Sequence, residues 1–216
     1  GRGLSRAQAT RRRVGATLAA AGATEVLAYP FSSAAAIERF EPGAPSVRLV
    51  NALDPQADRL RRSLLPGLLD VARRNLGRGL TDLRVFEIGT VFRPTAGVTA
   101  GTDFIPLGAQ RPDDATLAAL DTSIPEQGWR VAALFLGDAL PKQPGAAAVP
   151  AGLADALDAA RQVGLATAVR VEPVQGSHPA LHPGRTAELR APDGRGGERV
   201  VGVAGELLPS IAAELD

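Results

Sequence analysis

The only two histidines of the chain, His178 and His182, lie four residues apart in the segment SHPALHPGR. On one face of an α-helix, this spacing would suit two ligands of a transition metal such as zinc. Pro179 and Pro183 oppose a helix here, because each proline ring removes a backbone donor. No acidic cluster adjoins the pair to complete a ligand set. The sequence therefore predicts no metal site.

Patterns typical of nucleophilic or nucleotide-dependent catalysis are also absent from the sequence. There is no cysteine and no G-x-S-x-G around a serine. There is no G-x-x-x-x-G-K-[ST] phosphate loop, and the only lysine is Lys142. The glycine-rich stretch at 194–197 is typical of a hairpin turn. From the residues alone, we predict no catalytic, cofactor-binding or metal-binding residue.

One acidic side chain, Glu87, stands inside the largely apolar stretch LRVFEIGTVFRP at 83–94. Apolar residues alternate onto both faces, which predicts a central strand over 83–93 that is covered on both sides. A carboxylate in such a strand needs a cationic partner. We therefore expect Glu87 to form a buried ion pair; the nearby candidates are Arg59, Arg61, Arg62 and Arg84.

Capping residues, hydrophobic periodicity and glycine or proline breaks predict the elements around that strand. Helices are expected at 6–21 (with a Ser5–Gln8 capping box), 33–40, 63–77, after Pro112, 152–163 (stopped by Gly164) and near Pro209. Strands are expected at 24–29, 46–51, 129–136, 167–174, 186–191 and 199–204. Hairpin signals without regular strand–helix alternation predict an α+β fold with a mainly antiparallel sheet flanked by helices. We expect a single domain over 1–216, with a loop-rich insertion at about 94–127 and a flexible connection at 137–150.

The composition is that of an ordinary globular chain. The 216 residues are 45% hydrophobic and 22% charged, and the formal net charge of +1 gives no strong attraction to nucleic acid or anionic membranes. No apolar run approaches the roughly 18 residues of a membrane helix, so we expect a cytoplasmic protein with no membrane partner. Because methionine is absent, we also expect a piece excised from a longer chain.

Six short segments, in four groups along the chain, carry a resemblance to a known family. They are GATEVLAYPF (22–31); NAL (51–53) with LRRSLLPGLL (60–69); VFEIGTVFR (85–93); and HPGRTA (182–187) with GVAGELLP (202–209). Together they resemble the synthetase-like module of phenylalanine–tRNA ligase beta subunits, related to the class II aminoacyl-tRNA synthetase core. The segment at 22–31 resembles motif 1 of that class, and the segment at 85–93 takes the place of motif 2. The resemblance covers nearly the whole chain and implies a class II synthetase-like fold.

Departures from the class II pattern imply that this segment is catalytically inactive. In catalytic members, an Arg-x-Glu follows the motif 2 strand and its arginine holds the α-phosphate, whereas Pro94 and Thr95 follow Arg93 here. After Glu206 the chain has no arginine of the kind that grips ATP in motif 3. Without those cations and a magnesium site, a triphosphate is not stabilised. We therefore expect no cofactor in this segment, with ATP and Mg²⁺ bound elsewhere in the holoenzyme.

The resemblance further implies a non-catalytic interface module. Family members attach phenylalanine to its tRNA as (αβ)₂ assemblies, so the implied partners are the catalytic alpha subunit, a second αβ pair and tRNA(Phe). The interface candidates are Val14, Leu18, Pro30 and Phe31, all in the motif 1 unit. A helix stripe such as Val14 and Leu18 usually fills the core of its own domain, which is the favoured interpretation for those two. For Pro30 and Phe31, core and interface remain evenly balanced.

Two alternatives stay open. A stand-alone ligand-binding domain with a degraded class II fold would need a pocket with convergent polar groups. A tRNA-contacting module would use Arg11–Arg13 together with Arg73, Arg74 and Arg78, and its RNA binding would weaken steeply with salt. The near-zero net charge argues against RNA binding as the sole role.

Overall fold

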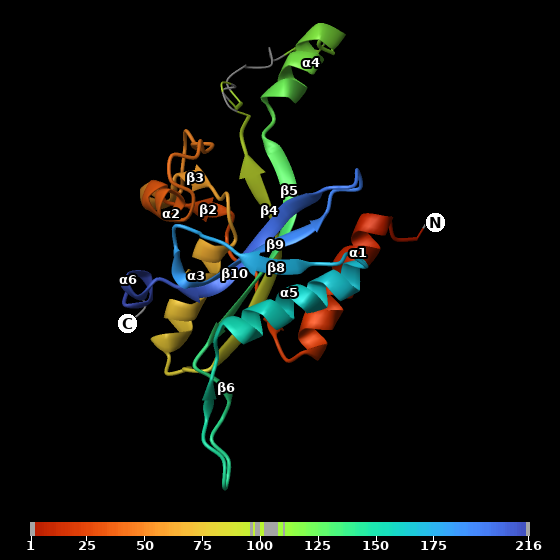
Figure 1. Cartoon of the computed structure of the whole chain (residues 1–216). Coiled ribbons are helices and arrows are strands. Elements are labelled where there is room, and N and C mark those ends of the chain that lie inside the picture. The colour runs from red at the N-terminus through yellow and green to blue at the C-terminus, as the bar shows by residue number, and fades with distance from the viewer. Residues whose placement is uncertain (1–2, 96, 98–99, 102–107, 110, 215–216) are drawn as a thin grey trace. The chain divides into compact units, whose positions relative to one another are not determined.

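The computed structural model describes residues 3–95, 97, 100–101, 108–109 and 111–214 (Figure 1). The chain forms two compact units. Unit 1 comprises Gly1–Ala28, Leu65–Ile88 and Val131–Asp216, and unit 2 comprises Tyr29–Leu64 and Gly89–Arg130. None of the described helices has the length and apolar content that crossing a membrane requires.

Unit 1 contains four of the described α-helices: α1 (Arg6–Ala20), α3 (Leu65–Leu76), α5 (Leu153–Thr167) and the short α6 (Pro209–Ala212). Helix α1 begins with the predicted capping box. The Gln8 N–H donates to Ser5 Oγ at 3.3 Å, and the Ser5 N–H donates to Gln8 Oε1 at 2.8 Å. Two of the otherwise unpaired donors of the first turn are thereby satisfied.

Among the described residues, the strands form two three-stranded sheets and two two-stranded pairs. In the first, β4 (Leu83–Arg93) lies between β1 (Thr24–Glu25) and β5 (Glu126–Leu136), and β1 runs parallel to β4. The predicted central strand is therefore confirmed with its bounds. The second sheet is antiparallel, with the order β10 (Glu198–Leu207), β9 (Leu181–Pro192), β8 (Glu172–Gln175). A small hairpin joins β6 (Asp138–Leu140) to β7 (Val149–Pro150).

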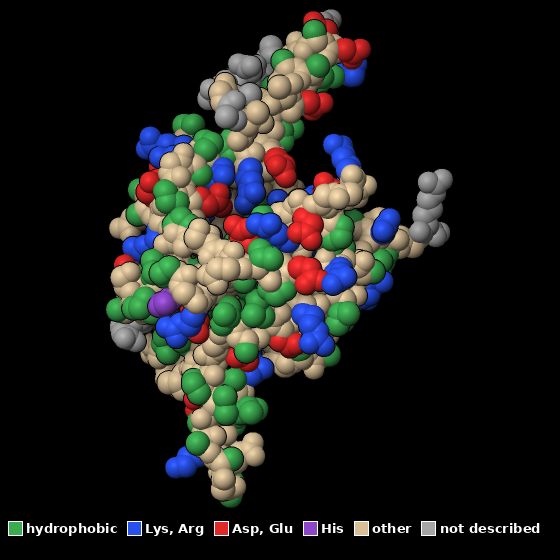
Figure 2. Space-filling view, viewed as in Figure 1, with side chains coloured by type: hydrophobic (Ala, Val, Ile, Leu, Met, Phe, Trp, Pro, Cys, Tyr) green, Lys and Arg blue, Asp and Glu red, His purple; other side chains and the backbone are tan. Residues whose placement is uncertain are grey.

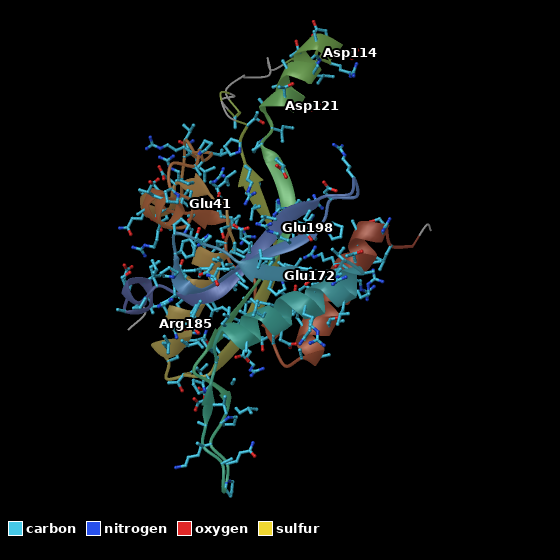
Figure 3. All side chains as sticks on the ribbon, viewed as in Figure 1. Glu41, Asp114, Asp121, Glu172, Arg185 and Glu198 are labelled. Carbon is cyan, nitrogen blue, oxygen red and sulfur yellow. The ribbon has the colours of Figure 1, made fainter. Side chains whose placement is uncertain are left out.

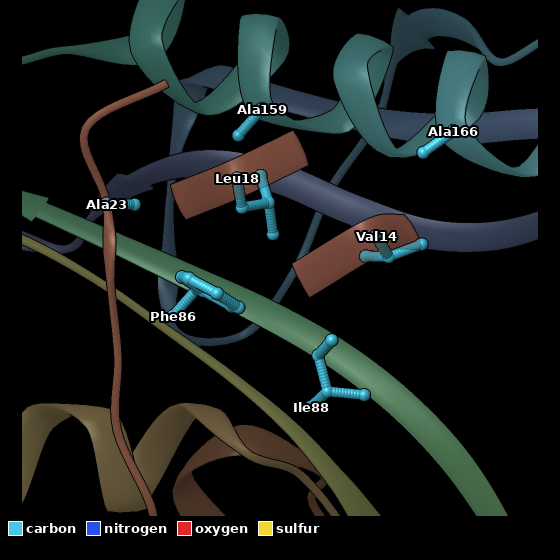
Figure 4. Packing of buried hydrophobic residues seen from close by; sticks show 7 residues of the cluster. All are labelled: Val14, Leu18, Ala23, Phe86, Ile88, Ala159 and Ala166. Carbon is cyan, nitrogen blue, oxygen red and sulfur yellow. The ribbon is translucent and has the colours of Figure 1, made fainter. Parts of the chain in front are cut away.

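The core of unit 1 forms where α1 and α5 meet the central strand (Figure 4). Figure 4 shows Val14 and Leu18 of α1 close to Phe86 and Ile88, with α5 on the other side. Each fully buried side chain of this size contributes about 1.5–3 kcal/mol to folding. The buried members of this cluster are Val14, Leu18, Ala23, Phe86, Ile88, Ala159 and Ala166.

Unit 2 is built on an antiparallel pair, β2 (Phe31–Ser32) and β3 (Arg59–Leu60). Helix α2 (Ala34–Phe40) follows β2, and its N-cap Ser33 accepts the Ala36 N–H on Oγ at 3.0 Å. Unit 2 also contains the 3₁₀ turn η1 (Pro55–Ala57), helix α4 (Asp114–Ser123), the end of β4 and the start of β5.

Two strands predicted before residue 52 are wrong, one in its extent and one in its existence. The strand expected at 24–29 ends at Glu25, and only the bond from the Val26 N–H to Phe86 O continues it. The strand expected at 46–51 is absent, since Arg48 forms only an isolated bridge with Arg59. Val50 is fully exposed there, so no buried face stabilises an extended run.

Three further boundaries in unit 1 differ from prediction. Helix α5 passes through Gly164 and ends at Thr167, and its C-cap Ala168 takes the left-handed conformation with φ of 56°. Gly164 is buried, and a Cβ there would lie 2.8 Å from the carbonyl oxygen of Val169, so packing favours glycine at this position. The longer helix leaves only Glu172–Gln175 of the strand expected at 167–174. The segment 137–150, expected as a flexible connection, contains the β6–β7 hairpin.

The α+β class, with mainly antiparallel pairing and flanking helices, is confirmed. Within the expected insertion at 94–127, helix α4 is present, and residues 96, 98–99, 102–107 and 110 lie outside the described residues. A single domain over 1–216 with this insertion stays a prediction.

Candidate protein interface

Two aromatic side chains of unit 2 are exposed beside a proline. Tyr29 is 81% exposed and Phe31 is 42% exposed, while Pro30 between them is half-buried. Single exposed apolar residues are common, but two exposed rings only two residues apart offer apolar surface that a partner protein can cover. This segment contains two of the four interface candidates that the sequence singled out.

The backbone at Pro30 and Phe31 is held by the buried Arg61. The Arg61 N–H donates to Pro30 O at 2.9 Å, and its carbonyl accepts the Phe92 N–H at 2.9 Å. Its side-chain Nε donates to Thr90 O, also at 2.9 Å. Phe31 itself pairs with Leu60 in the β2–β3 ladder. Because these bonds fix the segment, little conformational entropy is lost when a partner covers the rings.

Two more apolar side chains of unit 2, Val50 and Leu53, are fully exposed in the turn before η1. Asp54 caps this 3₁₀ turn by accepting the Gln56 N–H on Oδ1 at 2.8 Å. The Leu49 N–H donates to Asp58 O at 2.8 Å and closes the turn on its other side. The sequence placed Val50 in the strand expected at 46–51 and Leu53 in the NAL motif, and neither residue was an interface candidate. The signal that could have found them is the presence of two apolar residues beside the Asp54–Pro55 turn.

Val14 and Leu18, the other two interface candidates, lie in the core of unit 1. Helix α5 packs along α1, and Phe86 and Ile88 lie against the same side chains (Figure 4). A partner could reach either residue only by opening this core. Their part in the module is to hold α1 on the sheet.

Glu87 is fully buried in the central strand, between the core residues Phe86 and Ile88. Arg84, one of its candidate partners, points to the opposite face of the strand by alternation. The Arg84 guanidinium lies near Asp155, with Arg84 Nη2 3.5 Å from Asp155 Oδ1. The buried ion pair of Glu87 stays a prediction.

The arginine that ends the central strand, Arg93, lies beside a carboxylate of its own unit. Arg93 Nη2 is 3.7 Å from Glu41 Oε1, and Arg62 Nη2 is 2.8 Å from Glu41 Oε2. The three side chains come from β4, the end of α2 and the residues after β3. Glu41 therefore balances part of the positive charge of both arginines.

The two histidines serve as acceptors in local turns. His178 Nδ1 accepts the Ala180 N–H at 3.2 Å, and His182 Nδ1 accepts the Gly184 N–H at 3.1 Å. His182 lies on strand β9 and not on a helix. Within the described part of the chain, no three His, Cys, Asp or Glu side chains are grouped to hold a metal ion.

Two exposed aspartates have a pKa below the usual carboxyl range. Hydrogen bonding with Thr116 lowers the pKa of Asp113, the N-cap of α4. The Arg195 N–H, and then the Gly197 N–H, lower the pKa of Asp193 at the β9–β10 turn. Both carboxylates complete turns of the backbone, which is a structural role.

Comparison with known proteins gives consistent matches. The model of the family described as phenylalanyl tRNA synthetase beta chain CLM domain matches residues 1–216. The phenylalanine–tRNA ligase beta subunit of Leifsonia xyli is 56% identical over 220 residues, which cover 100% of this chain and 26% of that protein. The beta subunit of Streptomyces avermitilis is 39% identical, with the same coverage of both chains. That of Thermobifida fusca is 37% identical over 98% of this chain and 26% of the relative.

These relatives are subunits of an aminoacyl-tRNA synthetase. The chain spans about a quarter of the length of each of these beta subunits. Within that class, the chain belongs to the phenylalanyl-tRNA synthetase beta chain CLM domain family, as the sequence motifs predicted. Among solved structures, a pyrrolysyl-tRNA synthetase from Desulfitobacterium hafniense aligns with a TM-score of 0.49 and 16% identity. That alignment covers 85% of this chain and 55% of the other. A histidine–tRNA ligase subunit from Alicyclobacillus acidocaldarius aligns with a TM-score of 0.48 and 16% identity, over 81% and 45% of the two chains.

Proposed function

We propose that this chain is a non-catalytic interface module of a cytoplasmic phenylalanine–tRNA ligase beta subunit. In this proposal it binds the catalytic alpha subunit within an (αβ)₂ assembly. The assembly attaches phenylalanine to tRNA(Phe) with ATP and Mg²⁺, which bind outside this segment. The observation that carries the proposal is the exposure of Tyr29 and Phe31 on a backbone that Arg61 holds in place.

The energetics of these two rings favour a protein partner. Burying an aromatic side chain of this size contributes about 1.5–3 kcal/mol. Aromatic anchors near the centre of an interface carry much of its binding energy. Tyr29 also brings a hydroxyl that can donate to the partner at the rim of the contact.

The absence of catalysis is supported by the charges around Arg93. In the synthetase class that the sequence resembles, an arginine at this strand end holds an α-phosphate. Here Glu41 lies 3.7 Å from Arg93 and also pairs with Arg62. A nucleotide phosphate at this place would have to compete with a carboxylate that is already part of the fold.

The charge distribution offers less support for a tRNA-contacting module. Arg11, Arg12 and Arg13 are exposed on α1. On the face shown in Figure 2, however, acidic and basic side chains intermingle. Binding to nucleic acid draws its affinity mainly from a patch of positive charge, which mixed charges weaken.

The proposal is tested by assembly of the full-length beta subunit with its alpha subunit. Size-exclusion chromatography with light scattering gives the mass of the complex for the wild type and for Tyr29→Ser/Phe31→Ser. We expect the double variant to lose or weaken the complex. Leu165→Ser is the matched control, because Leu165 is an exposed apolar residue of unit 1 and should leave assembly unchanged. Full assembly of the double variant would overturn the proposed interface.

A further inference from the structure

Glu41, at the end of α2 in unit 2, is a carboxylate that two arginines share. Glu41 Oε2 accepts from Arg62 Nε at 3.0 Å and from Arg62 Nη2 at 2.8 Å, and Glu41 Oε1 lies 3.7 Å from Arg93 Nη2. Figure 3 labels Glu41 beside α2, among other charged side chains. Two guanidinium groups that face one carboxylate leave an excess of positive charge in the cluster.

The Arg62 side of this cluster is fixed and largely shielded from water. Arg62 Nη1 donates to Pro45 O at 2.6 Å, and the Arg62 side chain is 11% exposed. Glu41 is held at the end of α2, where its N–H donates to Ile37 O at 2.8 Å. The donors of Arg62 that reach Glu41 are therefore already oriented towards the position of an anion.

The Arg93 side of the cluster is open to solvent. The Arg93 side chain is 43% exposed, so a small anion can approach it from water. Guanidinium groups bind carboxylate and phosphate oxygens with the same fork of donors. The other acid of α2, Glu38, is engaged elsewhere, since its Oε2 accepts the Gly43 N–H at 3.0 Å.

We propose that Glu41 acts as a built-in anion which fills a two-arginine binding site for phosphate-class ligands. Arg62 and Arg93 form this site, and the Glu41 carboxylate occupies it in place of a phosphate group. The inference rests on the proposed function, because it supplies a physical reason why this module binds no nucleotide. Removal of the carboxylate should leave two adjacent cations whose mutual repulsion an external anion relieves.

The test compares pyrophosphate binding by the full-length beta subunit and by its Glu41→Gln variant, using isothermal titration calorimetry at low salt. We expect Glu41→Gln to gain one site per chain that binds at least about tenfold more tightly than any such site in the wild type. Glu41→Gln/Arg93→Ala should lose that gain. Glu38→Gln is the matched control, because it removes the same charge from the same helix.

A second measurement keeps the test informative if Glu41→Gln is unstable. Pyrophosphate should then raise the thermal midpoint of Glu41→Gln but not that of Glu41→Gln/Arg93→Ala, because a ligand that binds the native state stabilises it. A folded Glu41→Gln variant that binds no more pyrophosphate than Glu38→Gln would overturn the inference. Assembly with the alpha subunit is a separate readout, so the proposed function and this inference can fail independently.

Discussion

The guanidinium of Arg84 lies 3.5 Å from the carboxylate of Asp155 and joins the central strand to the first turn of α5. Arg84 Nη2 also donates to Ala139 O in β6 at 2.8 Å. Asp155 in turn accepts the Gly152 N–H on Oδ2 at 3.0 Å, which caps the start of α5. One side chain of β4 thus positions both the base of the β6–β7 hairpin and the start of a core helix.

Replacement of Arg84 by alanine should destabilise unit 1. The change removes a partly buried charge-assisted contact and leaves Ala139 O without this donor, so we expect a loss of about 1–3 kcal/mol. Urea unfolding followed by circular dichroism measures the effect. Arg73→Ala is the control, because its pair with Asp70 is exposed on α3 and should contribute less than about 1 kcal/mol. Equal losses in the two variants would contradict the assigned role of Arg84.

Gly137, at the junction of β5 and the hairpin, should not tolerate a side chain. Its φ is +75°, and a Cβ there would collide with the Thr81 carbonyl oxygen and the Asp82 carboxylate. We expect Gly137→Ala to cost about 3 kcal/mol or more in unfolding free energy. Gly145→Ala separates the cost of the positive φ from the cost of the collision, because Gly145 has a φ of +80° but open space around it. That control should cost only about 1 kcal/mol, and a similar loss in both variants would argue against the collision.

Gly67, in the first turn of α3, should be required by packing although alanine is the better helix former. A Cβ at this position would lie 2.9 Å from the Cβ of Ala28. We expect Gly67→Ala to destabilise the chain, because the clash outweighs the gain of about 1 kcal/mol in helix propensity. The double variant Gly67→Ala/Ala28→Gly should recover most of the loss. A thermal unfolding cycle of the four proteins measures the coupling, and strict additivity would show that the contact is unimportant.

Local signals were sufficient where neighbours in sequence decide the structure. Ser5 and Gln8 fix the start of α1 because the capping box is complete within four residues. The alternating pattern of 83–93 gave the bounds of the central strand, since both of its faces are buried. Pro30 and Phe31 were found as interface candidates only through resemblance to a family motif.

Signals failed where residues distant in sequence decide. Gly164 looked like a helix stop but lies inside α5, because its missing Cβ makes room for Val169 O. The two-residue strands β2 and β3 depend on each other and have no periodicity of their own. The sequence did not predict the ion pair of Glu41, because its partner Arg62 lies 21 residues away and only the fold brings them together.

The pKa of Asp193 predicts a local response to acid. The N–H groups of Arg195 and Gly197 donate to Oδ1 at 2.7 and 3.0 Å and lower this pKa. A group whose pKa is lower in the folded state stabilises the turn above its unfolded pKa, and this contribution is lost as the pH falls through the folded pKa. A carboxyl titration by NMR should give Asp193 a midpoint below the usual aspartate value. A midpoint at the usual aspartate value would contradict these hydrogen bonds.

The hydrogen bonds of Arg61 that fix the backbone at Pro30 and Phe31 should contribute to assembly as well as to folding. In Arg61→Ala the backbone bonds to Pro30 and Phe92 can persist, but the bond from Nε to Thr90 O is lost. Because Arg61 is buried, we expect a loss of about 1–3 kcal/mol in unfolding free energy. A less ordered segment should also bind the alpha subunit more weakly, mainly through faster dissociation. Surface plasmon resonance with the full-length subunits measures that rate, with Arg48→Ala as an exposed control from the same unit. If Arg61→Ala is destabilised but dissociates at an unchanged rate, Arg61 acts only in folding. The Tyr29–Phe31 segment would then not need to be rigid to bind the alpha subunit.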